Sequence, residues 1–207
     1  MIYARRLAAV AVAGALAYVA IDVALFLLRT NLSLLHNAES DYGNGPYAWL
    51  MDSNFLVRGA FSAAAAGAIW LVWRRPLARA GAVLIGVWAL SSGFLAFFRD
   101  DLTGAPVSAH GVVHLTAAFV AFLACLVGTL LLTIDFRGSP LGRGQASVLA
   151  VFWAGALLGF LALGAAGFHP HSLGGLYERI FIGAEILWLI IASAGTFRLG
   201  GPRGDAV

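Results

Sequence analysis

The chain alternates between six long apolar stretches and short polar segments. The apolar stretches run roughly over residues 7–28, 50–73, 77–98, 111–134, 147–167 and 178–197. Each is long enough to cross the hydrocarbon core of a bilayer, about 30 Å thick, as an α-helix. Apolar and polar residues do not alternate with a period of two, which argues against a β-barrel. The pattern therefore predicts an all-α, polytopic bundle of six transmembrane helices that forms a single domain over residues 1–207.

The first stretch also has one feature of a secretory signal peptide, because Arg5 and Arg6 precede it. It is longer than the apolar region of a signal peptide, and no persuasive cleavage site follows it. We therefore expect this stretch to remain in the protein as the first span.

Composition agrees with a membrane protein. Hydrophobic residues make up 61% of the chain and charged residues 11%, whereas soluble domains carry about a quarter charged residues. A soluble fold of this size could not bury so much apolar surface. The net charge is +3, and most of the arginines lie at the ends of the apolar stretches, so the charge predicts orientation in a bilayer and no binding to nucleic acid. The single cysteine, Cys125, excludes an intrachain disulfide.

The arginines divide unequally between the two sets of span ends. One set carries only Arg29, Arg99 and Arg179. The other set carries Arg5, Arg6, Arg74, Arg75, Arg79, Arg137, Arg143, Arg198 and Arg203. Because positive residues accumulate on the cytoplasmic side of membrane proteins, the second set and both termini are predicted to be cytoplasmic. All the histidines then fall on the outer side, and these are His36, His110, His114, His169 and His171.

His110 and His114 are the first candidates for chemistry. A spacing of four places them on one helix face, which continues through small residues such as Ala118 and Cys125. Small residues allow close helix packing in membranes, so this face is predicted to point inward. Two such histidines could bind a divalent metal such as zinc, with His169, His36, Asp100 or Asp101 as a further ligand. The alternative is a polar role without metal, at a helix start or an interface.

Glu178 and Glu185 are the second candidates. They are seven residues apart, on one face of the sixth predicted span. An ionised carboxylate within the hydrocarbon is costly, so Glu185 is expected to face the interior and to have a partner, of which Arg58 is the best candidate. Asp22 is a further acid within a span. These residues either tie helices together or form a polar pocket that opens to the outer side, in which Glu178 or Glu185 handles a proton or holds a polar head group.

Two loops contribute weaker candidates. Asp52 follows the turn-rich segment DYGNGPY and is placed to cap a helix or to join the pocket. His169 and His171 flank a proline in the loop after the fifth span, where a solvated loop is the alternative to a binding role.

Three segments resemble a known family. They are AWLMDSNFLVRGAFSAAAAG (48–67), SAHGVVH (108–114) and GLYERIFIGAEILWLIIA (175–192). In this order they are similar to the domain-of-unknown-function family 998, small bacterial integral membrane proteins. The resemblance covers residues from about 40 to 197 and implies a multi-pass protein of the bacterial cytoplasmic (inner) membrane. It implies no established activity.

Three functions are compatible with these observations. The first is an enzyme, such as a hydrolase, isomerase or cyclase, that acts on a lipid or another hydrophobic small molecule. Its chemistry would rest on a metal at His110 and His114 or on the acids Glu185 and Glu178, with Arg58 and Asp52 in the same pocket. The second is a ligand-binding or transport protein, although the predicted spans lack the internal prolines of broken transporter helices. The third is a non-catalytic subunit of a membrane complex. The sequence leaves the oligomeric state and the cofactor open.

Overall fold

The computed structural model describes residues 1–29, 31–139, 142–169 and 171–199. Six long helices are present in these ranges: α1 (Ile2–Leu28), α2 (Ala48–Val72), α3 (Pro76–Leu95), α4 (Ala109–Arg137), α5 (Arg143–Ala166) and α6 (Gly174–Leu199). A short 3-10 helix, η1 (Glu39–Gly43), lies between α1 and α2. All six long helices have the length and apolar character needed to cross a membrane. The prediction of an all-helical, six-span protein is therefore confirmed.

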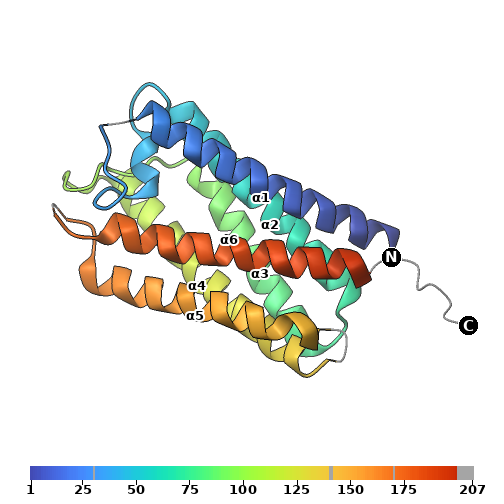
Figure 1. The fold of residues 1–207 in the computed structure, drawn as a ribbon. Coiled ribbons are helices and arrows are strands. Elements are labelled where there is room, and N and C mark those ends of the chain that lie inside the picture. Colours follow the sequence, from blue (N-terminus) through green and yellow to red (C-terminus); the bar gives the residue numbers. More distant parts are fainter. Residues whose placement is uncertain (30, 140–141, 170, 200–207) are drawn as a thin grey trace, which may run out of the picture.

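The helices form a closed bundle. Each long helix packs against the next one in the chain, and α6 returns to pack against α1 (Figure 1). Helix α6 also contacts α2 and α4, so its inward face is covered from several sides. Much of the core consists of large aromatic side chains such as Trp88, Trp188 and Phe181, which are completely buried.

Glycine allows the closest helix contacts in this bundle. A Cβ atom on Gly59 of α2 would lie 2.8 Å from the carbonyl oxygen of Ala89 in α3. A Cβ atom on Gly159 of α5 would lie 2.8 Å from the backbone nitrogen of Phe181 in α6. Both distances are too short for a real side chain, so the absence of a Cβ atom sets the spacing of these two helix pairs.

The start of α1 and the end of α6 lie at the same end of the bundle (Figure 1). The guanidinium carbon of Arg5 is 4.6 Å from the ring centre of Phe197. Arg75, between α2 and α3, forms an ion pair of 3.2 Å with Asp135 near the end of α4. The arginine-rich segments therefore share one end, as the sequence predicts, with Arg203 outside the described residues. Which end faces the cytoplasm stays a prediction.

The opposite end carries the histidines and the three longer loops, and we call it the histidine end. The loop between α1 and α2 does not remain on its surface but folds inward, so that all five residues of η1 are buried. Tyr42 of η1 packs with Leu25, Met51, Phe55 and Leu95 in an apolar cluster. The histidine end is thus closed by an ordered, polar segment of the chain.

The predicted spans and the observed helices differ mainly at their ends. The third helix ends at Leu95, three residues before the predicted limit, and residues 96–98 form a turn. This turn directs the carbonyl group of Phe98 toward α4, where it accepts a hydrogen bond from His114.

Candidate functional site

A cavity of about 220 Å³ lies between α4 and α5 at the histidine end. We call it the α4–α5 cavity. Its walls are mostly apolar and come from Leu115, Ala118, Phe119, Phe122, Phe160, Leu163, Gly164 and Phe168. Four polar side chains share its lining, and these are Ser40, Asp100, His114 and Glu178. The polar groups of this one cavity therefore come from η1, from the segment after α3, from α4 and from α6.

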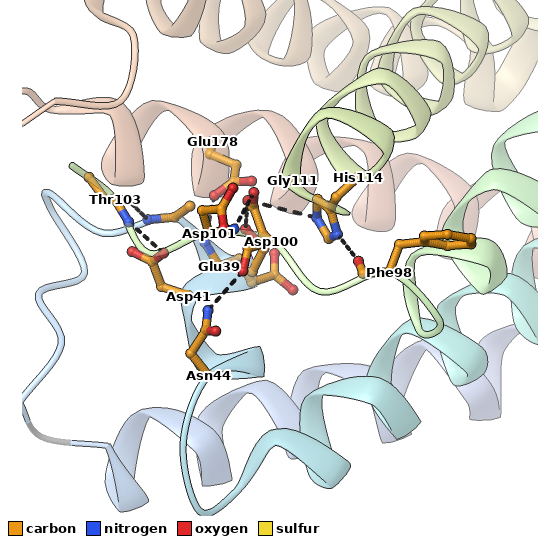
Figure 2. Close-up of polar contacts among 12 residues, drawn as sticks. Glu39, Asp41, Asn44, Phe98, Asp100, Asp101, Thr103, Gly111, His114 and Glu178 are labelled. Atoms are coloured by element: carbon orange, nitrogen blue, oxygen red, sulfur yellow. Dashed lines mark hydrogen bonds and ion pairs between the residues drawn. The ribbon is translucent and has the colours of Figure 1, made fainter. Parts of the chain in front are cut away.

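His114 is held in a defined orientation. Its Nδ1 atom lies 2.6 Å from the carbonyl oxygen of Phe98. A carbonyl oxygen can only accept a hydrogen bond, so Nδ1 carries the hydrogen. The Nε2 atom is then left to face Asp100, whose Oδ2 atom is 3.8 Å away (Figure 2). This arrangement leaves Nε2 free to take up or release a proton beside a carboxylate.

Asp100 is fixed by hydrogen bonds as well. Its Oδ2 atom accepts a hydrogen bond of 2.7 Å from the hydroxyl of Ser40. Its Oδ1 atom accepts one of 2.9 Å from the backbone N–H of Asp101. Burial raises the pKa of the Asp100 carboxyl above its ordinary value, while the imidazole of His114 and the hydrogen bond from Ser40 act in the opposite direction.

Glu178 projects from the beginning of α6 into the same region (Figure 2). Its side chain is buried, and its Oε2 atom accepts a hydrogen bond of 2.7 Å from the backbone N–H of Glu39. The side chain of Glu39 in turn accepts a hydrogen bond from the hydroxyl of Tyr18 in α1. The segment η1 therefore connects the carboxylate of α6 to a phenol on α1.

Arg58 of α2 lines a recess of about 10 Å³. The same recess is also lined by Glu39, Ser40, His114 and Glu178. The Nε atom of Arg58 donates a hydrogen bond of 3.2 Å to Ser92. Its guanidinium carbon lies within cation–π distance of three aromatic rings, at 5.9 Å from Tyr18, 5.1 Å from Phe55 and 5.0 Å from Trp88. None of the ion pairs formed among the described residues includes Arg58. The positive charge is thus held mainly by aromatic rings, close to the polar end of the cavity.

Glu185 does not belong to this site. It is completely buried in the middle of α6, and its Oε1 atom accepts a hydrogen bond of 3.3 Å from Thr129 of α4. It lines neither the α4–α5 cavity nor the recess beside Arg58. The expected pairing of Glu185 with Arg58 is therefore wrong, because the two side chains have different neighbours.

Asp52 is also placed differently from the expectation. Tyr47 is the N-cap residue of α2, so Asp52 lies beyond the first turn and does not cap the helix. Its carboxylate is 3.7 Å from the guanidinium of Arg99, in a partly exposed pair at the edge of the bundle. Asp52 is absent from the lining of the cavity.

The three histidines of the expected metal site do not form a ligand set. His110 is exposed at the start of α4, with its ring 5.6 Å from that of Phe98. His169 lies in the loop after α5, where its backbone N–H donates to Ser172. Within the ranges that the structure describes, no group of three His, Cys, Asp or Glu side chains is arranged to hold a metal ion. Only His114 of the three lines the cavity.

Sequence reasoning missed Glu39 and Ser40 and gave Asp100 only as an optional metal ligand. Glu39 and Ser40 belong to the short 3-10 helix η1 and Asp100 to the segment after α3, where no periodic pattern indicates which side chains point inward. The cluster of polar residues in ESDYG (39–43), immediately before turn residues, is the one local signal of this segment.

Comparison with known proteins identifies a family but no activity. No curated protein and no solved structure matches the chain. Residues 12–195 match a family described as "protein of unknown function (DUF998)", and this match covers α2 to α5 completely, most of α1 and α6, and every residue that lines the α4–α5 cavity. The chain therefore belongs to the domain-of-unknown-function family 998.

Proposed function

We propose that this protein is a membrane enzyme that binds a lipid or another amphiphilic molecule in the α4–α5 cavity and performs acid–base chemistry on its polar end. The observation that carries the proposal is the division of the cavity into apolar walls and one polar end. That end contains Glu178 and the pair formed by His114 and Asp100.

The apolar walls support access from the bilayer. Leu115 and Phe119 line the cavity and are 44% and 58% exposed on the outer surface of α4. Across the gap, Gly164 of α5 is exposed, and a Cβ atom built on it meets no other atom within 4 Å. A hydrocarbon chain can therefore lie between the two helices without leaving an apolar environment, with its polar end toward the histidine end.

The polar end supports proton transfer. The Nε2 atom of His114 can accept a proton, and the carboxylate of Asp100 stabilises the imidazolium that results. Glu178 lines the same cavity and supplies the second group for acid–base chemistry, as the acid where His114 is the base. The hydroxyl of Ser40 donates to Asp100 and not to His114, so the arrangement is not that of an activated serine nucleophile. Arg58 lies close enough to favour negative charge that develops on a bound substrate.

The test compares wild-type protein with Glu178→Gln in vesicles made from a total lipid extract, whose composition is followed by mass spectrometry. We expect one lipid or lipid-soluble species to be consumed by the wild type. Loss of a general acid or base lowers such rates by about 10²- to 10⁴-fold. Glutamine keeps an oxygen that can accept the hydrogen bond from Glu39, so the fold is expected to persist.

Two leucine variants separate the cavity from the rest of the bundle. Gly164→Leu fills the cavity and should abolish turnover, whereas Gly86→Leu introduces the same side chain into open space on α3 and should not. Turnover by Glu178→Gln at the wild-type rate would contradict the proposed chemistry. A lipid that copurifies in fixed proportion and is never converted would instead indicate a binding protein without catalysis.

A further inference from the structure

A second cavity, of about 340 Å³, lies between α1 and α6. We call it the α1–α6 cavity. It is separated from the first one by η1 and α6, and its volume falls in the range of small-molecule sites, about 300 to 1,000 Å³. Charged side chains line one end of it, and aliphatic side chains of α1 and α6 line the rest.

One end of this cavity contains charges of both signs. Asp22 of α1 and Glu39 of η1 supply carboxylates, and Arg179 of α6 supplies a guanidinium. Asp22 and Arg179 do not form an ion pair with each other. The Nη1 atom of Arg179 is held by three backbone carbonyl groups, those of Leu34, Asn37 and Gly175.

Three further polar atoms of these two side chains form no hydrogen bond with the described residues, although the guanidinium carbon of Arg179 also lies 5.8 Å from the ring centre of Tyr42. The Oδ1 atom of Asp22 and the Nε and Nη2 atoms of Arg179 are buried and lack a hydrogen bond. Buried polar groups in proteins are nearly always hydrogen-bonded, so an acceptor for Arg179 and a donor for Asp22 are both needed at this place.

The rest of the cavity is an apolar track between α1 and α6, with buried isoleucines as its floor and exposed aliphatic side chains at its bilayer-facing rim. Ile182, Ile186 and Ile190 follow one another by one helical turn on α6, with Val19 opposite them on α1. From Arg179 to Ile190 the track descends about 16 Å toward the middle of the bundle, at 1.5 Å per residue. Leu187 and Val19 are 45% and 43% exposed, so the track is open to surrounding acyl chains.

We propose that the α1–α6 cavity is a binding site for a zwitterionic phospholipid. Its phosphate lies near Arg179, its ammonium group lies at Asp22 and Glu39, and one acyl chain follows the isoleucine track. An anionic head group without an amine would face two carboxylates with one guanidinium, and a simple cation would be repelled by Arg179. A head group that carries both charges satisfies both. This site goes beyond the proposed function, since it lies on another face of the bundle.

The occupancy test uses phosphatidylethanolamine with a photoreactive diazirine in its acyl chain, in vesicles of phosphatidylglycerol, followed by peptide mapping. We expect labelling of the α1 and α6 residues of the track. Gly183→Leu projects a side chain into this cavity, where a Cβ atom meets nothing within 4 Å, and should lower that labelling about ten-fold, which corresponds to 1.4 kcal/mol of binding. Gly86→Leu, which projects into open space on α3 and lines neither cavity, should leave it unchanged.

The head-group test uses Asp22→Asn, which removes a charge without breaking a hydrogen bond of the described structure. We expect the preference for photoreactive phosphatidylethanolamine over photoreactive phosphatidylglycerol to fall about ten-fold, as for the loss of one charge-assisted hydrogen bond. Asp52→Asn removes an acid outside the cavity and should preserve the preference.

Three results would overturn the proposal. If Gly183→Leu lowers labelling of the track no more than Gly86→Leu does, the labelling comes only from annular lipid. Equal labelling by both lipids in the wild type would exclude recognition of the ammonium group. An unchanged lipid preference in Asp22→Asn would remove Asp22 from the site. None of these outcomes depends on turnover, so failure of the enzyme proposal would leave this test intact.

Discussion

At the scale of single residues, the molecule places a carboxyl group and an imidazole together in a poorly solvated space. Asp100 is only 9% exposed in its side chain, and its nearest opposite charge is that of His114 when protonated. Burial penalises the charged form of Asp100, and this effect outweighs the stabilisation that His114 and Ser40 provide. The group therefore holds its proton to a higher pH in the folded than in the unfolded protein.

This difference makes stability depend on pH. Between the ordinary aspartate pKa, about 3.9, and the raised pKa of Asp100, the folded state binds more protons than the unfolded state. Stability therefore falls as pH rises through this window. Asp100→Asn does not titrate, so its stability relative to the wild type should increase with pH over the window and level off above it. Unfolding of the purified protein in detergent, measured from pH 4 to pH 8, checks this expectation.

His114→Gln serves as the matched comparison. It removes the imidazole that lowers the pKa of Asp100, so the window should widen and the pH dependence should become steeper. Identical slopes in the wild type and Asp100→Asn would show that Asp100 does not titrate in this way. Asp41, Asp101 and Glu178 are acids near Asp100, and all three remain unchanged in this comparison.

The sequence predicts some site residues well and others poorly, for a geometric reason. His114 and Glu178 belong to helices with a recognisable inward face, and both line the α4–α5 cavity. Glu185 shares the face of Glu178 but lies about 10.5 Å deeper along the helix axis. His110 lies one turn closer to the surface than His114. Periodicity gives the direction of a side chain, whereas the depth at which a cavity begins depends on loops that the pattern does not describe.

At the scale of elements, η1 is the part of the structure that shapes both cavities. Asp41 is completely buried, and its two oxygens accept hydrogen bonds from Asn37 and from the backbone N–H of Thr103. Arg179 of α6 holds the preceding segment through the carbonyl group of Asn37. Most of these contacts join residues that are far apart in the chain, so no local pattern reveals them. The six spans, in contrast, follow from the lengths of continuous apolar runs, and only their ends shift.

Loss of the Asp41 carboxylate should loosen η1. Asp41→Ala leaves two donors unpaired, one of them a backbone N–H, at a cost of roughly 1–3 kcal/mol. Asp52→Ala removes a partly exposed ion pair and should cost at most about 1 kcal/mol. Thermal unfolding in detergent, combined with limited proteolysis of residues 31–47, distinguishes the two variants. Equal stability and equal cleavage of this segment in both would mean that η1 is held by its apolar contacts alone.

At the scale of the whole molecule, an even number of spans places the start of α1 and the end of α6 at one end (Figure 1). The excess of arginine at that end predicts that it is cytoplasmic. The orientation decides from which leaflet the two cavities are reached, because both have their polar groups toward the histidine end.

Single cysteines can establish the orientation. Val107 is 62% exposed at the histidine end, and Gly144 is exposed at the start of α5, at the other end. In a chain with Cys125→Ala, we expect Val107→Cys to react with a membrane-impermeant maleimide on intact cells. Gly144→Cys should react only after the membrane is opened. The reverse result would show that the histidine end faces the cytoplasm.

Glu39 lines both the α1–α6 cavity and the recess beside Arg58. A charged molecule in the α1–α6 cavity or in the recess beside Arg58 therefore acts on the carboxylate of Glu39. The electric field of that molecule also reaches the other of these two spaces. Thermodynamic linkage makes such an effect mutual: the factor by which occupancy of one cavity alters affinity in the other is equal in both directions. The membrane around this protein, through its own lipids, would then set the working affinity for whatever occupies the space between α4 and α5.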